Sequence, residues 1–112
     1  MIDQIRTEPD YDNRIRQAPI VVIDFYALWC GPCRMIQPLL EEYDNELATS
    51  SAGKVAFFKV DVDECADLAA KMGVAAMPTF VIYHNGTKAT TVVGASMPKI
   101  KEQVDALLEK EN

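Results

Sequence analysis

Two cysteines, Cys30 and Cys33, lie where an apolar run gives way to a helical pattern, in the stretch WCGPC. Residues 20–27 (IVVIDFYA) are nearly all apolar and rich in β-branched and aromatic side chains, which is typical of a buried strand. The apolar residues that follow at helical spacing are Ile36, Leu39, Leu40, Tyr43 and Leu47. We therefore predict a strand at 20–27 and a helix at about 30–48, with these five residues on its buried face.

This arrangement places Cys30 at the N-terminus of the predicted helix. Backbone N–H groups lack partners there and the helix dipole is positive, so a thiolate, the nucleophilic form of cysteine, is stabilised. Cys30 could attack a disulfide, and Cys33, one turn further on, could resolve the mixed disulfide. Zinc binding is the alternative, but a closed site needs four ligands. Only Cys65 and His84 remain and there is no second CxxC pair, so we expect no metal.

Composition limits the partners and the compartment. The chain has 112 residues, 49% of them hydrophobic and 25% charged, which is typical of one soluble domain spanning residues 1–112. A net charge of −6 argues against nucleic acid or an anionic membrane as a partner. The N-terminus, MIDQIRTEPDYDN, reads as neither a signal peptide nor a transit peptide, and three cysteines make no disulfide framework. We expect the cytoplasm, although a mature chain whose leader had been removed would look the same.

Turn and cap signals place the other elements. Thr7 is expected to cap a first helix, Asp63 a short helix at about 64–72, and Asn85-Gly86 to form a hairpin turn. The remaining strands are expected at about residues 1–5, 54–61, 79–84 and 87–93, and a last helix at about 97–110. The order β-α-β-α-β-α-β-β-α predicts an α/β protein with a mixed sheet and helices on both faces.

The stretch WCGPC resembles the active site of thioredoxin, and the likeness covers nearly the whole chain. IDFYALWCGPCRMIQP, FFKVDVDE, AAMPTFVIYHNG and VVGA occur in the order of that family and at about its spacing. The resemblance implies the thioredoxin fold and general protein disulfide reduction through Cys30 and Cys33. It also implies oxidised proteins as substrates and recycling by an NADPH-dependent thioredoxin reductase, with roles in electron transport and cell redox homeostasis. The chain has no GxGxxG or P-loop, so we expect no cofactor, and we expect a monomer.

The resemblance also assigns roles to residues around the cysteines. Asp24 matches a buried carboxylate that takes the Cys33 proton, and Lys59 matches the lysine that pairs with it. The alternatives are an aspartate facing solvent and an ordinary surface lysine. Pro78 matches a cis proline, whereas an X-Pro bond is trans by default. The residues that would form an apolar collar for substrate binding around Cys30 are Trp29, Gly31, Pro32, Val74, Ala75, Met77, Pro78, Val93, Gly94 and Ala95. Val74 and Val93 could instead belong to the core.

Two positions, Tyr26 and Cys65, are ones at which members of the family differ. Tyr26 replaces the tryptophan that the family most often carries, so we expect altered packing beneath the site without a change of chemistry. Cys65 matches a cysteine of some eukaryotic-type members. At the positions where those members carry further cysteines, this chain has Met72 and Ala76, which rules out a second internal disulfide. Cys65 is then a buried structural residue or a regulatory thiol.

Other functions remain open from the sequence. A disulfide isomerase or a reductant of one client would carry the same cysteine pair. The Gly31-Pro32 dipeptide between the cysteines resembles reducing members, whereas oxidising and isomerising relatives usually carry other dipeptides. A non-catalytic thioredoxin-like binding subunit is the more distant alternative, because such a scaffold could lose the cysteines, Asp24, Lys59 or Pro78.

Overall fold

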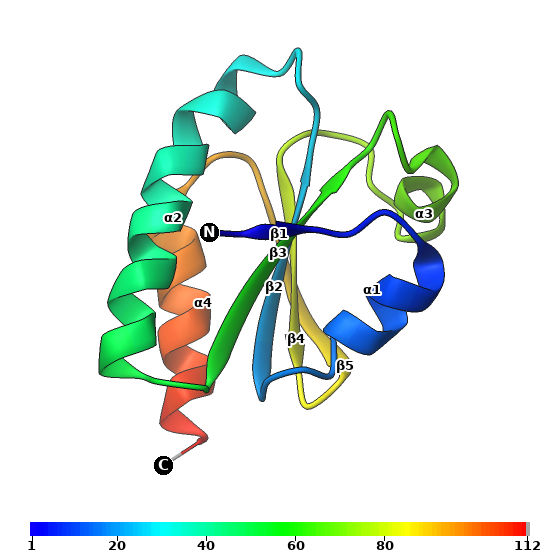
Figure 1. The fold of residues 1–112 in the computed structure, drawn as a ribbon. Helices are drawn as coiled ribbons and strands as arrows, with labels where there is room; N and C mark the ends of the chain where they lie inside the picture. The colour runs from blue at the N-terminus through cyan, green and yellow to red at the C-terminus, as the bar shows by residue number, and fades with distance from the viewer. Residues whose placement is uncertain (112) are drawn as a thin grey trace.

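A computed structural model describes residues 1–111, which form a five-stranded sheet with helices on both faces (Figure 1). The elements in chain order are β1 (Asp3–Gln4), α1 (Glu8–Arg14), β2 (Ile20–Tyr26), α2 (Gly31–Ser50), β3 (Val55–Asp61), α3 (Ala66–Lys71), β4 (Thr79–His84), β5 (Thr87–Val93) and α4 (Met97–Glu109). The predicted order of elements and the thioredoxin fold are confirmed.

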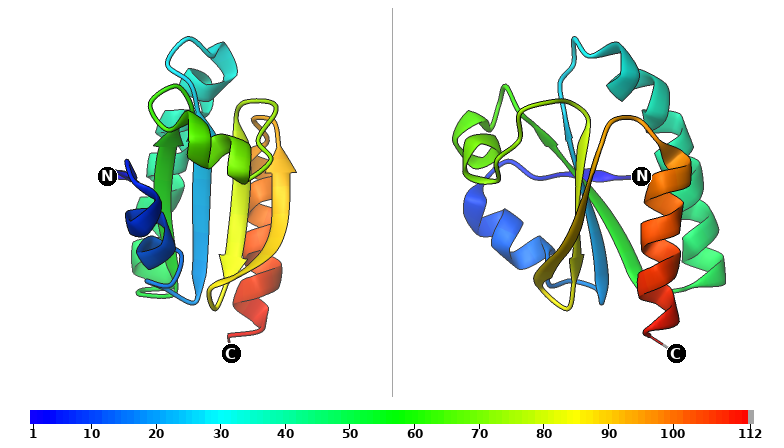
Figure 2. Two further views of the ribbon diagram at one scale, coloured as in Figure 1. Left: turned by 90° about the vertical axis from the view of Figure 1, so that its right-hand side faces the viewer. Right: turned by 180° about the vertical axis from the view of Figure 1, so that it is seen from behind.

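The central strand of the sheet is β2, which leads into the cysteine pair. The strand order is β1-β3-β2-β4-β5. Strand β2 pairs with β3 in parallel and with β4 antiparallel, and the β4–β5 hairpin completes one edge (Figure 2). The short strand expected near the N-terminus is present as β1, which pairs in parallel with β3 at the other edge. The end of β2, and with it the cysteine pair, is therefore held between two neighbouring strands.

Side chains of β2 alternate between two apolar cores. Ile20 and Val22 pack on the side covered by α2 and α4, whereas Ile23 and Phe25 pack on the side covered by α1 and α3 (Figure 1). Helices cover both faces of the sheet, so successive side chains of β2 from Ile20 to Phe25 are all buried. This explains the continuous apolar run at residues 20–27.

Local signals explain where several elements begin and turn. The Thr7 hydroxyl accepts a hydrogen bond of 3.2 Å from the N–H of Asp10, which caps α1 as predicted. Asn85 and Gly86 have φ values of 54° and 81°, the left-handed conformation that a two-residue hairpin requires. The hairpin prediction is therefore confirmed.

The predicted cap of the third helix is wrong. Cys65, without a side-chain cap bond, precedes α3, which begins at Ala66. The carboxylate of Asp61 accepts hydrogen bonds from the N–H groups of Asp63 (2.9 Å) and Glu64 (3.4 Å) and so organises this turn. Asp63 is thereby free to face Trp29.

The predicted buried face of α2 needs one correction. Ile36, Leu40, Tyr43 and Leu47 are buried, but Leu39 is 49% exposed. Leu39 lies at the margin of the apolar stripe, about 100° around the helix from its sequence neighbour Leu40, so the two leucines differ in burial. The helix also continues to Ser50, two residues further than predicted.

The neighbouring leucines of α2 provide a test of this packing. Leu40 is 1% exposed, so Leu40→Ala should lower the free energy of unfolding by about 2–5 kcal/mol through lost burial and a cavity. Leu39→Ala is the matched control and should cost less than about 1 kcal/mol. Urea unfolding of the oxidised proteins measures both values. Equal losses would contradict the packing described here.

Candidate active site

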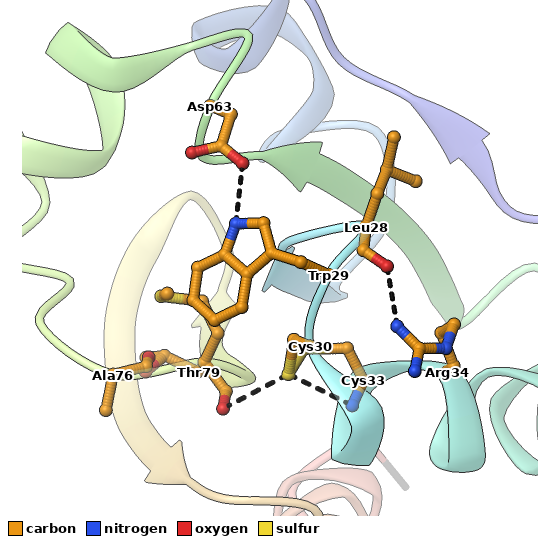
Figure 3. The surroundings of a disulfide bond; sticks show 9 residues. Leu28, Trp29, Cys30, Cys33, Arg34, Asp63, Ala76 and Thr79 are labelled. Atoms are coloured by element: carbon orange, nitrogen blue, oxygen red, sulfur yellow. Dashed lines mark hydrogen bonds between the residues drawn. A yellow bond between two sulfur atoms is a disulfide. The ribbon is translucent and has the colours of Figure 1, made fainter.

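The Cys30 side chain forms the N-cap of α2. After β2 ends, the N–H of Cys30 donates to the carbonyl of Ala27 at 3.2 Å, which turns the chain into the helix. The Cys30 sulfur then accepts a hydrogen bond of 3.2 Å from the N–H of Cys33 (Figure 3). Helix N-terminal N–H groups stabilise negative charge, so this geometry favours a thiolate once the pair is reduced.

Cys30 and Cys33 form a disulfide, with their Cα atoms 5.3 Å apart. The exposed fractions are 5% for Cys30 and 3% for Cys33, and Ala27 completes a small buried cluster around them. The structure thus represents the oxidised state of the pair. Two cysteines held this way can alternate between dithiol and disulfide.

The segment before β4 approaches Cys30 from the opposite side. The Met77–Pro78 bond is cis, as the family resemblance implied. The Met77 carbonyl oxygen lies 3.6 Å from the Cys30 sulfur, and the Thr79 hydroxyl donates to the carbonyl of Ala76 at 2.6 Å (Figure 3). The N–H of Gly94 donates to the Pro78 carbonyl at 2.8 Å. The turn before β4 and the turn after β5 therefore lie at the same end of the sheet as Cys30.

The residues proposed for the collar differ in exposure. Trp29 and Val93 are 66% and 61% exposed, which is unusual for large apolar side chains. Val74 packs against the core between the sheet and helices α1 and α3, in line with the structural alternative for this residue. The remaining members are exposed at Pro32, Ala75 and Ala95, half-buried at Gly31, Met77 and Gly94, and buried at Pro78.

Two contacts around the collar were not predicted from the sequence. The indole N–H of Trp29 donates to the Asp63 carboxylate at 2.9 Å, and Arg34 donates to the Leu28 carbonyl at 2.7 Å (Figure 3). Both fix the loop between β2 and α2. The sequence predicts Asp63 as a helix cap and gives no indication of its contact with Trp29.

Asp24 is a buried carboxylate in β2, 3% exposed. It lies two residues after Val22 and therefore faces the same side of the sheet, the side covered by α2. Among residues 1–111, neither of its carboxylate oxygens has a hydrogen-bonding partner. Desolvation raises the pKa of Asp24 to about 7, with the positive charge of Lys59 acting in the opposite direction. An acid with this pKa can exchange a proton near neutral pH.

Lys59 lies directly opposite Asp24 in the β2–β3 pairing. Its ammonium group lies 5.6 Å from the ring centroid of Tyr26, a cation–π distance. No salt bridge joins Lys59 to Asp24 among the described residues, so the lysine acts on the carboxylate through its field. Lys59, Tyr26 and Cys33 also line a common pocket of about 160 Å³ with Leu28, Arg34 and Gln37. This pocket provides an opening beside Cys33.

The third cysteine lies apart from this pair. Cys65 is 9% exposed, and its sulfur lies 3.4 Å from the carbonyl oxygen of Arg6. Burial raises its pKa, with the carboxylates of Glu64 and Asp61 adding to the effect. A buried thiol of this kind reacts slowly, which favours the structural interpretation.

Residues 1–111 contain neither a cluster of metal ligands nor a membrane-spanning helix. In residues 1–111, no three side chains of histidine, cysteine, aspartate or glutamate gather closely enough to hold a metal ion. None of the helices described there combines the length and the apolar character needed to cross a membrane.

The chain is similar to known thioredoxins along nearly its whole length. The thioredoxin family model matches residues 3–106. Thioredoxin-1 of Saccharomyces cerevisiae is 42% identical over 106 residues, covering 95% of this chain and 98% of that protein. The solved structure of oxidised mitochondrial thioredoxin 3 from the same yeast superposes with a TM-score of 0.85 at 36% identity, covering 94% of each chain. A thioredoxin from Trypanosoma brucei brucei gives a TM-score of 0.87 at 27% identity, covering 97% of this chain and 92% of that one.

The buried Asp24 leads to a prediction about stability. Its ordinary pKa is 3.8 and its folded-state pKa is about 7, so between these values the folded protein binds more protons than the unfolded chain. Stability therefore falls as pH rises through this window and levels off above it. Asp24→Asn removes that loss, so the variant should gain up to about 4 kcal/mol over the parent between pH 4 and pH 8.

Urea unfolding at pH 4, 6 and 8 measures this gain, with the exposed Asp12→Asn as a control that should show much less change with pH. A stability difference between Asp24→Asn and the parent that stays constant with pH would contradict the raised pKa.

Proposed function

Because this chain belongs to the thioredoxin family, whose members are protein-disulfide oxidoreductases, we propose that it is a general protein disulfide reductase recycled by an NADPH-dependent thioredoxin reductase. One observation supports the proposal above the others. The Cys30 sulfur lies at the N-cap of α2, bonded to Cys33 and beside the exposed Trp29. A nucleophile, its resolving partner and an apolar contact surface are thus in one place.

The first step is attack by Cys30. Its thiolate attacks one sulfur of a substrate disulfide, forming a mixed disulfide and releasing the other substrate sulfur as a thiolate. The N–H of Cys33, which points at the Cys30 sulfur, favours the ionised form before attack. The exposed collar residues provide an apolar surface for the substrate backbone and side chains on either side of its cysteine.

The second step is resolution by Cys33. Its sulfur attacks the Cys30 sulfur, the Cys30–Cys33 disulfide forms, and the second substrate sulfur leaves as a thiolate that takes up a proton. Cys33 must lose its own proton first, and we assign that proton to Asp24, whose pKa of about 7 suits an acceptor at neutral pH. Lys59 and the pocket beside Cys33 then offer a path by which the proton reaches solvent.

Recycling requires two electrons from outside the chain. The proposed donor is a flavin-dependent thioredoxin reductase that oxidises NADPH and returns Cys30 and Cys33 to thiols. We also propose that the protein acts as a monomer in a reducing compartment, the cytoplasm. The acidic net charge and the odd number of cysteines support this part of the proposal.

Substitution of each cysteine tests the order of attack. The parent protein should reduce insulin disulfides with NADPH and a thioredoxin reductase, and Cys30→Ser should show no turnover because the attacking sulfur is absent. Cys33→Ser should accumulate a stable mixed disulfide with the substrate, detected by mass spectrometry after acid quenching. Turnover by Cys30→Ser, or trapping through Cys30→Ser and not Cys33→Ser, would overturn the assignment.

Asp24→Asn tests the proton acceptor. In single-turnover reactions at pH 7, formation of the mixed disulfide should keep its rate, while resolution by Cys33 should slow roughly 10²-fold because the acceptor is lost. Raising the pH should restore much of the resolution rate, since hydroxide can then deprotonate Cys33. Rapid acid quenching resolves the two steps. An unchanged resolution rate at pH 7 would exclude Asp24 from this role.

A further inference from the structure

An apolar groove runs beside the cysteine pair between α2 and α4. It has a volume of about 450 Å³. Helix α2 contributes Pro32, Met35 and Leu39, and the start of α4 with the preceding loop contributes Ala95, Met97 and Pro98. Ile36, 2% exposed, is the remaining lining residue. No lining side chain is charged or hydrogen-bonding, so the groove suits an apolar occupant.

The exposure of the groove residues is unusual. Met35 is 76% exposed and Leu39 is 49% exposed, whereas Ile36, Leu40, Tyr43 and Leu47 of the same helix are buried. The loop that follows β5 leads into α4 next to the first turns of α2 (Figure 2). Because both side chains line the same apolar groove, they form a continuous exposed apolar patch of the kind that favours an interaction site.

The groove is continuous with the surface at which disulfide exchange takes place. Pro32 lies between the two cysteines in the sequence, and both it and Ala95 belong to the collar as well as to the groove. In the mixed disulfide, the substrate cysteine that is bonded to Cys30 must therefore lie next to one end of the groove. The segment that follows or precedes the attacked cysteine can enter the groove directly.

The length of the groove sets which substrate residue would fill it. Pro32 and Leu39 are seven residues apart on a helix, a rise of about 10 Å. An extended peptide covers about 3.3 Å per residue, so this length corresponds to about three residues. The side chain about three positions from the attacked cysteine would reach Met35 and Leu39.

We propose that this groove is a specificity subsite that binds a large apolar side chain of the substrate, about three residues from the cysteine that Cys30 attacks. The subsite rests on the proposed function, because its occupant is a disulfide substrate of Cys30. Met35 and Met97 give it two flexible, polarisable side chains, which can adapt to leucine, methionine or phenylalanine alike. The cleft lined by Arg6, Glu8, Asp63 and Glu64 is charged, so the apolar preference belongs to the side of α2 and α4.

Peptide disulfides test the subsite. Each is a short homodimer with one cysteine per strand and either leucine or serine three positions before or after it. The pre-reduced protein is mixed with each peptide, and the second-order rate constant is followed by the fluorescence of Trp29, the single tryptophan, which adjoins Cys30. We expect leucine to speed the reaction about tenfold over serine at one of the two positions, as burial of one large apolar side chain would give.

The double variant Met35→Gln/Leu39→Gln should bring the leucine-to-serine ratio close to one. Both residues are exposed, so the variant should fold, and circular dichroism checks this. Ala48→Gln places the same new side chain on an exposed position of α2 outside the groove and should keep the parent ratio. The small disulfide 5,5′-dithiobis(2-nitrobenzoate) should react equally with all three proteins, because it is too short to reach Leu39.

The outcomes separate the subsite from the proposed function. If the parent reacts with the peptides but shows no leucine preference at either position, or if the double variant keeps that preference, the subsite is overturned and the reductase function stands. If the reduced parent reacts with no peptide, the reductase function itself fails. A dimer of the parent in sedimentation equilibrium that the double variant abolishes would assign the groove to a second copy of this chain and overturn the subsite.

Discussion

The hydrogen bond from the N–H of Cys33 to the Cys30 sulfur, 3.2 Å long, defines the site on which the rest of the structure depends. It requires Cys30 to end a loop and begin a helix at the same residue. The central strand β2 delivers the chain to that point, and Ile36 and Leu40 anchor the following helix in the core. The sheet and the packing of α2 therefore hold the N–H of Cys33 in position to donate to the Cys30 sulfur.

The burial of the Asp24 carboxylate lowers the stability of the fold. A carboxylate in the central strand of a sheet covered on both faces cannot turn to solvent, and its oxygens have no hydrogen-bonding partner within residues 1–111. Desolvation accordingly raises its pKa to about 7, while Lys59, paired opposite it, limits the increase. A fold selected for stability alone would carry an apolar residue here. The same desolvation that destabilises the protein gives the site a proton acceptor suited to neutral pH.

Much of this could be predicted from the sequence, because short-range rules govern it. Local sequence alone favours a hairpin turn at Asn85-Gly86, a helix cap at Thr7 and a strand from Ile20. All three are present in the structure. The errors occur where distant residues compete. Asp63 resembles a helix cap, yet Asp61 organises that turn and Trp29 binds the Asp63 carboxylate from 34 positions away. The cis bond at Pro78 came from resemblance, since sequence alone favours trans. The groove at Leu39 was missed because helical periodicity cannot tell the edge of a buried stripe from its centre.

The most direct test of the account is the alkylation rate of Cys30 in the reduced protein at pH 7. Iodoacetamide labelling followed by peptide mapping separates Cys30 from Cys33 and Cys65. If helix N-terminal donors hold the Cys30 sulfur as a thiolate, Cys30 should react about tenfold faster than free cysteine, and Cys65 more slowly than free cysteine. A Cys30 rate equal to that of free cysteine would contradict the central claim, because the helix would then not favour the ionised sulfur.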